Sequence, residues 1–192
     1  MAVYRVSNSR AETDFVIITA AGAGGGPGPL GSDGPSWVYK HLAKNKRAVV
    51  IRIQYSDPRL SYAVFDTYGC IRWAHTQFPS KPIIIIGWSM GGAAIINAIY
   101  HYTTLHENHD IKGFITLAGQ SKRTTVLSHI LNIPKFYLHG DEDTSISLKS
   151  LKLIFNRSQE PKFFQILKSN DHSVIDAYPL ITKFIDLCIG NK

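Results

Sequence analysis

Cysteine is scarce in this chain, which has two, Cys70 and Cys188, among its 192 residues. Small domains that depend on disulfides carry many closely spaced cysteines, so this composition argues against a disulfide framework. The two cysteines lie far apart, each in an amphipathic stretch. We therefore expect two reduced thiols in the core of an intracellular protein.

Long hydrophobic runs are also missing. The first apolar run, Phe15 to Ala21, is far shorter than the roughly 20 residues that cross a bilayer. The stretch from Met1 to Glu12 mixes charged and polar residues and has no apolar segment of the kind that export signals contain. The sequence thus predicts no export signal, no transmembrane helix and no membrane partner, with the cytoplasm as the expected location.

Acidic residues are outnumbered by basic ones, and the net charge is +7. The basic residues do not form the pattern typical of nucleic-acid binding. Their longest clusters are Lys44–Arg47 and Lys122–Arg123, and no basic run alternates with aromatic residues. Hydrophobic residues make up 44% of the chain, which suffices for one core in a protein of this length. We expect a single domain over residues 1–192 and no nucleic-acid partner.

Six short apolar runs rich in β-branched residues recur along the chain, and they are Phe15–Thr19, Ala48–Ile53, Pro82–Ile86, Gly113–Leu117, Lys135–Leu138 and Lys162–Leu167. Such runs are typical of parallel strands covered on both faces. Segments with apolar residues at three- and four-residue spacing alternate with them and predict helices over Ser36–Asn45, Ser61–Phe78, Gly91–Thr104, Thr124–Leu131, Ser145–Phe155 and Val174–Ile189. We expect an α/β three-layer sandwich with a mostly parallel central sheet of at least six strands and helices on both faces.

The most specific motif is Gly-Trp-Ser-Met-Gly at residues 87–91, which matches Gly-x-Ser-x-Gly between a predicted strand and a predicted helix. A serine on such a tight turn projects its hydroxyl outward, and the flanking glycines serve where no Cβ fits. The N-terminus of the next helix directs backbone N–H groups toward charge that forms on a substrate. The alternative is a chance match in a structural turn, and the strand-to-helix context favours Ser89 as a nucleophile.

With this motif the chain resembles the α/β-hydrolase superfamily, and in particular its small serine hydrolases. The resemblance extends from Phe15 to the C-terminus, and residues 118–134 are too few to hold a cap domain. Family members carry nucleophile, acid and histidine in that order. Residues 139–143, His-Gly-Asp-Glu-Asp, are similar to the family's His-Gly-x-x-Asp, which implies Asp143 as the acid. Residues 169–173, Ser-Asn-Asp-His-Ser, are similar to its histidine loop, which implies His172 as the general base.

Each assignment has a structural alternative. Asp141 and Glu142 compete with Asp143 for the role of the acid, and Asp143 alternatively serves only as the N-cap of the next predicted helix. A histidine in a loop is often only a solvated side chain, which is the alternative for His172. We expect His139 to be a structural hydrogen-bonding residue. In a triad, the histidine takes the serine proton while the acid fixes the imidazole tautomer.

The glycine-rich loop after the first predicted strand is similar to the family's His-Gly-x-Gly-Gly, with Ala21 in place of the histidine. The resemblance implies an oxyanion hole made by the backbone N–H groups of Met90 and of a loop residue, which we assign to Ala23 with Gly22 and Gly24 as alternatives. A nucleotide-binding loop is excluded because no Gly-Lys-Ser/Thr follows. Gly22, Gly24 and Trp88 are also candidate substrate contacts.

Basic residues follow three of the predicted strands, at the edge where parallel sheets bind their ligands. They are Arg59, Lys122, Arg123 and Lys168, of which Arg59 and Arg123 are our candidates for binding an anionic substrate. The alternative is that these are solvated loop charges. His101, His106 and His109 lack the close paired spacing of zinc ligands, so we expect no metal site there.

These features predict a serine hydrolase that cleaves a carboxylic ester or thioester of a small or short-acyl substrate through an acyl-enzyme. It would need neither cofactor nor metal. The alternative is a non-catalytic binding or scaffold protein that keeps the α/β-hydrolase fold.

Overall fold

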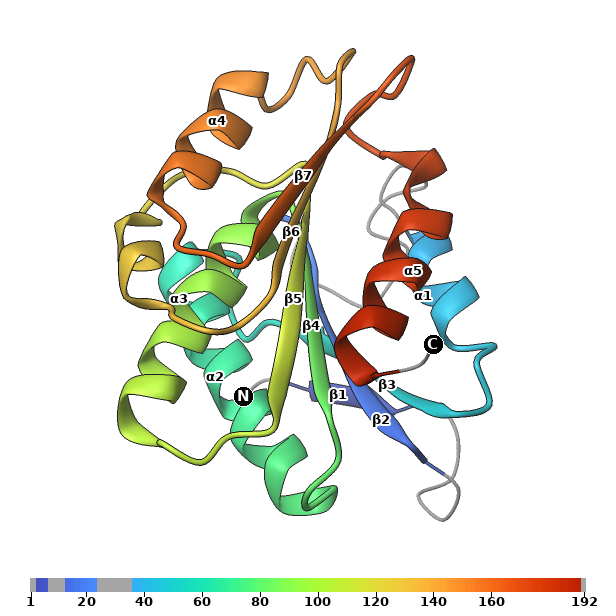
Figure 1. Ribbon diagram of the computed structural model, residues 1–192, viewed down its shortest axis with the longest axis vertical. Coiled ribbons are helices and arrows are strands. Elements are labelled where there is room, and N and C mark those ends of the chain that lie inside the picture. The colour runs from blue at the N-terminus through green and yellow to red at the C-terminus, as the bar shows by residue number, and fades with distance from the viewer. Residues whose placement is uncertain (1–2, 7–12, 24–35, 191–192) are drawn as a thin grey trace.

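The computed structural model describes residues 3–6, 13–23 and 36–190. Seven strands form one sheet in the order β1-β3-β2-β4-β5-β6-β7 (Figure 1). Their bounds are β1 Val3–Val6, β2 Phe15–Ala20, β3 Ala48–Gln54, β4 Ile83–Trp88, β5 Ile111–Leu117, β6 Lys135–Gly140 and β7 Lys162–Leu167. β2 through β7 pair in parallel, so the expected parallel sheet of six strands is confirmed.

The seventh strand, β1, was missed by the sequence analysis. It pairs antiparallel with β3, with Val3 opposite Gln54 and Val6 opposite Ile51. Four residues with an arginine among them give no periodicity that separates a strand from a loop. An antiparallel edge strand is common on otherwise parallel sheets. Here β1 covers the outer edge of β3.

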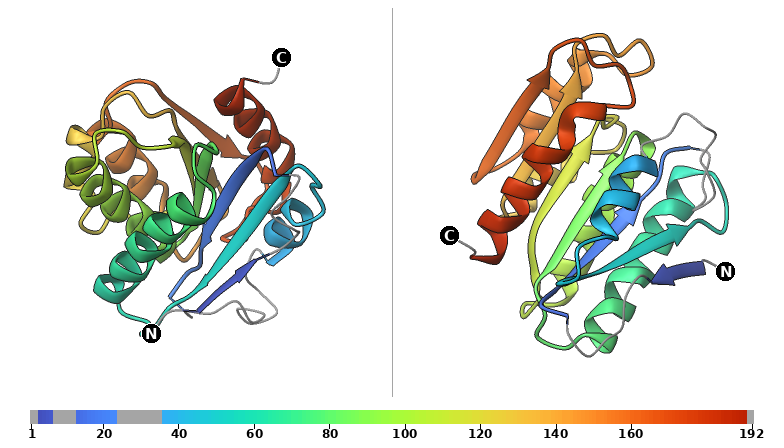
Figure 2. Two further views of the ribbon diagram at one scale, coloured as in Figure 1. Left: turned by 90° about the horizontal axis from the view of Figure 1, so that it is seen from below. Right: turned by 90° about the vertical axis from the view of Figure 1, so that its right-hand side faces the viewer.

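The described residues form five α-helices around the sheet, and their bounds are α1 Ser36–Leu42, α2 Leu60–Gln77, α3 Met90–Leu105, α4 Leu148–Arg157 and α5 Tyr178–Ile189. α2, α3 and α4 cover one face and α1 and α5 the other (Figure 1). Figure 2 shows the same layers from below and from the side. The three-layer arrangement matches the expected one.

Four predicted helices differ in kind or extent. The helix predicted over Ser36–Asn45 ends at Leu42, and the one predicted over Val174–Ile189 starts as a 3₁₀ turn, Ile175–Ala177, before α5 begins at Tyr178. The segment Thr124–Leu131 forms a short 3₁₀ helix over Thr125–His129, not an α-helix. The helix predicted from Ser145 begins three residues later, at Leu148. The delay has a local cause. The Asp143 carboxylate accepts hydrogen bonds from the backbone N–H groups of Ser145 and Ile146 and holds these residues in a turn ahead of the helix.

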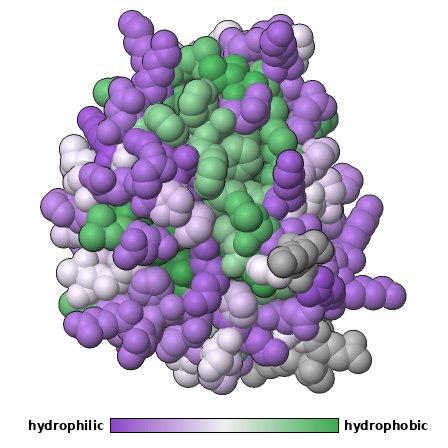
Figure 3. Space-filling view, in the orientation of Figure 1, coloured by the Kyte–Doolittle hydropathy of each residue, from purple (hydrophilic) through white to green (hydrophobic). Residues whose placement is uncertain are grey.

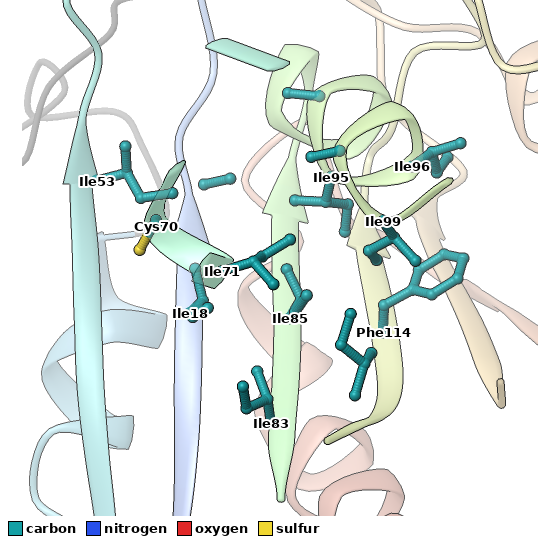
Figure 4. Packing of buried hydrophobic residues seen from close by; sticks show 14 of the residues in the cluster. Ile18, Ile53, Cys70, Ile71, Ile83, Ile85, Ile95, Ile96, Ile99 and Phe114 are labelled. Carbon is teal, nitrogen blue, oxygen red and sulfur yellow. The ribbon is translucent and has the colours of Figure 1, made fainter. Parts of the chain in front are cut away.

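The larger core lies between the sheet and the helices α2, α3 and α4. Figure 4 shows Ile18 of β2 and Ile85 of β4 facing Ile71 of α2 and Ile95 of α3. Alternate residues of the same strands point to the opposite face, where they pack against α1 and α5. Full burial of each such isoleucine contributes about 1.5–3 kcal/mol to folding, so both faces of these strands stabilise the sheet.

The two cysteines lie on opposite faces of the sheet. Cys70 of α2 belongs to the larger core, and Cys188 of α5 packs against the other one. Both are free thiols, as expected. No helix in the described part of the chain is long and apolar enough to cross a membrane.

The last strand departs from the expectation that all six parallel strands are covered on both faces. β7 is an edge strand, and Phe163, Phe164 and Gln165 are exposed. Figure 3 shows hydrophobic residues gathered over this strand, between α4 and α5. A continuous apolar run therefore indicated the strand correctly but not its place in the sheet.

The order of the elements sets the position of any site. Parallel strands have their carboxyl ends at one edge of the sheet, so the loops that follow β2 through β7 meet there. The segment between β5 and β6 holds only the 3₁₀ helix Thr125–His129, which confirms that no cap domain is inserted there. This segment therefore leaves the carboxyl edge uncovered.

Candidate active site

Ser89 occupies the sharp turn between β4 and α3. Its φ of 55° and ψ of −118° lie in a region that serine rarely adopts, which costs on the order of 1–3 kcal/mol. The flanking glycines make the turn possible, because a Cβ on Gly87 would collide with the carbonyl of Gly91 and a Cβ on Gly91 with that of Ala20. Ser89 thus sits, partly exposed, on the strained elbow that the motif predicts.

Asp143 and His172 form a hydrogen bond between the loops that follow β6 and β7. His172 Nδ1 lies 2.8 Å from Asp143 Oδ2, and the Asp143 side chain is fully buried. An ionised carboxylate only accepts, so Nδ1 carries the proton and Nε2 is left as the basic nitrogen. The other oxygen, Oδ1, accepts the N–H groups of Ser145 and Ile146, each at 2.8 Å. Asp143 therefore both caps the turn and orients the histidine, one oxygen for each.

The two competing carboxylates do not reach the histidine ring. The side chains of Asp141 and Glu142 are exposed. Both residues instead bond to the end of β7 and the loop that follows it through their backbone N–H groups. The N–H of Asp141 donates to Leu167 O at 3.0 Å, and that of Glu142 donates to Asn170 O at 2.9 Å. These bonds join the loop after β6, which carries Asp143 (the acid loop), to the end of β7 and the loop after it, which carries His172 (the histidine loop).

The histidine loop is also tied to the turn that carries Ser89. Trp88 Nε1 donates to the carbonyl of His172 at 2.9 Å, and the two rings lie 5.0 Å apart. Gly22 lies against the indole, where a Cβ would come within 2.7 Å of the ring. Trp88 and Gly22, both candidate substrate contacts in the sequence, therefore position His172.

His139 contacts both Asp143 and the backbone of the loop that carries it. Its Nε2 lies 2.7 Å from the carbonyl of Ile146 and 3.3 Å from Asp143 Oδ2, and its side chain is almost fully buried. A buried imidazole that bonds the backbone of the acid loop fits the structural role expected for it.

Backbone strain gathers at this edge of the sheet. Seven described residues other than glycine have a positive φ, and five of them follow the carboxyl ends of strands: Ser89, Ala118, Arg123, Ser169 and Val174. Val174 is β-branched, which makes its φ of 45° especially costly. Strained residues cluster at functional sites, so this distribution marks the same edge independently of the motifs.

The loop after β2 is anchored by a residue that the sequence analysis missed. The Tyr55 hydroxyl donates to the carbonyl of Ala21 at 2.9 Å, and both residues are buried. Burial holds the pKa of Tyr55 well above its ordinary value, so the phenol keeps the proton it donates. Tyr55 directly follows β3, the strand that pairs with β2. That position is the only feature of the sequence that could have indicated its contact with the loop after β2.

Ser89 opens into a cleft of about 480 Å³. The described residues that line it with Ser89 are Ala23, Arg59, Leu60, Ser61, Met90, Gln120, Lys122, Arg123 and Ile146. The candidates Ala23, Met90, Arg59 and Arg123 thus meet at Ser89, whereas Lys168 does not line the cleft. Leu60, Ser61, Gln120 and Ile146 were missed, because nothing but their position after a strand marks them. Gly24 lies outside the described residues.

The histidines near the end of α3 do not gather into a site. His106 follows the last residue of the helix and packs on Tyr102, with 4.4 Å between the rings. In the described part of the chain, no group of three or more His, Cys, Asp or Glu residues is placed to hold a metal ion.

Comparison with known proteins finds likeness in structure and not in sequence. No family model matches the chain, and no curated protein matches it. Among solved structures, the esterase domain of a Rhodothermus marinus protein is 12% identical with a TM-score of 0.73, over 99% of this chain and 100% of that one. Est1E from Butyrivibrio proteoclasticus is also 12% identical, with a TM-score of 0.77 over 98% and 94% of the two chains.

A third solved structure, of an alpha-beta serine hydrolase homologue from Coxiella burnetii, is 15% identical with a TM-score of 0.66. It covers 99% of this chain and 90% of that one. Likeness at these identities concerns the path of the backbone, and it runs over nearly the whole chain in all three comparisons. The protein therefore has the α/β-hydrolase fold, without a cap domain between β5 and β6.

Proposed function

We propose that this protein is a serine hydrolase that cleaves a carboxylic ester or thioester of a small substrate through an acyl-enzyme. The observation that carries the proposal is the Asp143–His172 hydrogen bond in a loop that Trp88 ties to the Ser89 elbow. The esterases among the structural neighbours support the same reaction class.

In the proposed reaction, Ser89 Oγ attacks the substrate carbonyl while His172 Nε2 takes its proton. Asp143 stabilises the imidazolium that results. The tetrahedral intermediate carries its negative charge on the former carbonyl oxygen, toward the N–H groups of Met90 and Ala23. The intermediate collapses, and His172 returns the proton to the departing alcohol or thiol. Water, deprotonated by the same nitrogen, then releases the acid and restores Ser89.

The experiment that tests this function is a pre-steady-state assay with a nitrophenyl ester of acetate or butyrate. Because the acyl-enzyme forms before it is hydrolysed, we expect a burst of nitrophenol equal to the enzyme concentration, followed by slower turnover. A matched thioester shows whether both leaving groups are accepted. Turnover without a burst, at substrate saturation, would oppose an accumulating acyl-enzyme, and no turnover of either substrate would oppose the function.

Replacing Tyr55 with phenylalanine should lower kcat about tenfold, which corresponds to the loss of one buried hydrogen bond. The Ala21 carbonyl would lose the donor that holds the loop after β2, which carries the proposed oxyanion donor Ala23. Tyr55 acts here as a positioning residue. Binding of a trifluoromethyl ketone, which forms an oxyanion on Ser89, should weaken in the same proportion, while binding of the product acid should not change.

The matched control is Tyr137→Phe. Tyr137 is also buried and also loses one hydrogen bond, to Ser158 Oγ at 2.6 Å, but within the core beneath α4. The two variants should lose similar stability, and only Tyr55→Phe should lose activity. Equal kcat in both variants would show that the Tyr55 hydroxyl serves the fold alone.

An open edge without a cap should favour short acyl groups. A tunnel that buried the acyl chain would raise kcat/KM about fourfold for each added methylene. We expect no such rise beyond hexanoate in a series of nitrophenyl esters from acetate to palmitate, and no jump in rate at the micelle threshold, since the connection between β5 and β6 holds no cap to be displaced. Turnover that climbs steadily to palmitate would contradict the open site.

Location belongs to the proposal as well. Two free cysteines on opposite faces of the sheet support a reducing compartment, and we assign the protein to the cytoplasm.

A further inference from the structure

The cleft that holds Ser89 is lined by cations. Arg59, Lys122 and Arg123 all line it, and no described Asp or Glu does. Arg59 comes from the loop after β3, and the other two come from the loop after β5, so two separate segments direct positive charge to one place.

Lys122 and Arg123 are the available charges. In the described structure, neither side chain has a hydrogen bond or an ion pair, and both are exposed. Arg123 also has a φ of 58°, a strained conformation for a residue other than glycine. A cation that only served solubility could occupy an unstrained position, so its placement at the cleft favours a binding role.

Arg59 is partly neutralised. Its Nε and Nη2 each lie 2.8 Å from an oxygen of Asp57, and this pairing lowers the pKa of the Asp57 carboxyl. The carboxylate fixes the guanidinium at the mouth of the cleft and leaves Nη1 as a donor. The exposed carboxylates nearest the triad in sequence, Asp141, Glu142 and Asp171, follow β6 and β7 and do not line the cleft.

The backbone adds to the positive potential. α2 begins at the cleft with Leu60 and Ser61, its first turn holds no acidic residue, and Arg59 provides no side-chain cap. The first N–H groups of a helix lack partners within it and carry a partial positive charge. The start of α3 is assigned to the oxyanion of the reaction, so α2 is the helix free to face an anionic group of the substrate itself.

We propose that the substrate carries a compact anionic group, a carboxylate or a phosphate, that binds between Lys122, Arg123 and the start of α2 while its ester carbonyl lies at Ser89. This inference rests on the proposed hydrolase function. It specifies the class of substrate, an acidic ester or thioester, and assigns Lys122 and Arg123 to its recognition.

The test compares two esters that differ in one group, nitrophenyl hexanoate and nitrophenyl hydrogen adipate, in which a carboxylate replaces the terminal methyl. At low salt, kcat/KM should favour adipate on the order of tenfold, the worth of one charge-assisted hydrogen bond. The preference should fade at molar salt, where the screening length is about 3 Å. Lys122→Gln and Arg123→Gln should each reduce it, and the double variant should abolish it.

Lys46→Gln is the matched control, because Lys46 is exposed and precedes β3, at the opposite edge of the sheet. It removes the same charge and should leave the preference intact. Inhibition of hexanoate hydrolysis by free glutarate and by inorganic phosphate then shows which anion binds more tightly.

Equal kcat/KM for the two esters at low salt, unchanged in the double variant, would overturn the proposed anion site while the hydrolase function stands. A protein that turns over neither ester and does not react with a fluorophosphonate would overturn both.

Discussion

Replacing Ser89 with alanine is expected to lower ester hydrolysis by at least about 10⁴-fold while leaving the fold intact. The hydroxyl is the proposed nucleophile, and no other side chain on the strained elbow can take its place. His172→Ala should cost nearly as much. Members of a triad act as a unit, so that losing either one forfeits almost the whole effect and leaves only the oxyanion hole and substrate binding.

Both variants should fold, because the Ser89 elbow is shaped by Gly87 and Gly91 and the His172 side chain is partly exposed. Steady-state turnover of nitrophenyl butyrate and a thermal melt give the two readouts. Ser128→Ala and His101→Ala, which alter residues away from the cleft, serve as controls of the same kind. Activity within about tenfold of the parent protein in either Ser89→Ala or His172→Ala would be incompatible with the assignment.

Replacing Asp143 with asparagine should lower turnover by about 10³-fold or more. The amide oxygen can still accept the N–H groups of Ser145 and Ile146, so the turn is kept. The amide nitrogen then faces His172 Nδ1 and donates to it, which moves the ring proton to Nε2. A histidine protonated at Nε2 cannot accept the Ser89 proton, and the variant should be folded but inactive.

Asp141→Asn and Glu142→Gln separate the acid from its neighbours. Both side chains are exposed, and the bonds that join the acid loop to the histidine loop come from their backbone. These two variants should keep most of the activity. If Asp141→Asn is the inactive protein and Asp143→Asn retains turnover, the carboxylate assigned to His172 is the wrong one.

The parallel strands and the Ser89 elbow were predictable because each depends on local sequence. Continuous runs of β-branched residues mark buried strands, and a serine between glycines after such a run allows one kind of turn. The resemblance to α/β-hydrolases implied Asp143 and His172 after the fifth and sixth predicted strands, which the structure places side by side as β6 and β7. The hydrogen bond between them follows from that placement.

The remaining contacts join loops that are distant in the sequence, and no local pattern encodes them. Tyr55 reaches Ala21 only because β3 pairs with β2, and Trp88 reaches the backbone of His172 across the sheet. The exposure of β7 likewise depends on its being last in the sheet, although its sequence reads as a buried strand. Strand order decides these features, and a single sequence does not specify it.

The most direct measurement is reaction with a fluorophosphonate probe followed by mass spectrometry of the peptide that contains Ser89. Such probes form a covalent bond only with a serine whose proton is taken by a base and whose developing charge is stabilised. The account predicts one equivalent of label, located on Ser89 and lost in Ser89→Ala, in His172→Ala and in heat-denatured protein. A folded protein that takes up no label, or takes it up on another serine, would contradict the account and point to a non-catalytic binding protein with this fold.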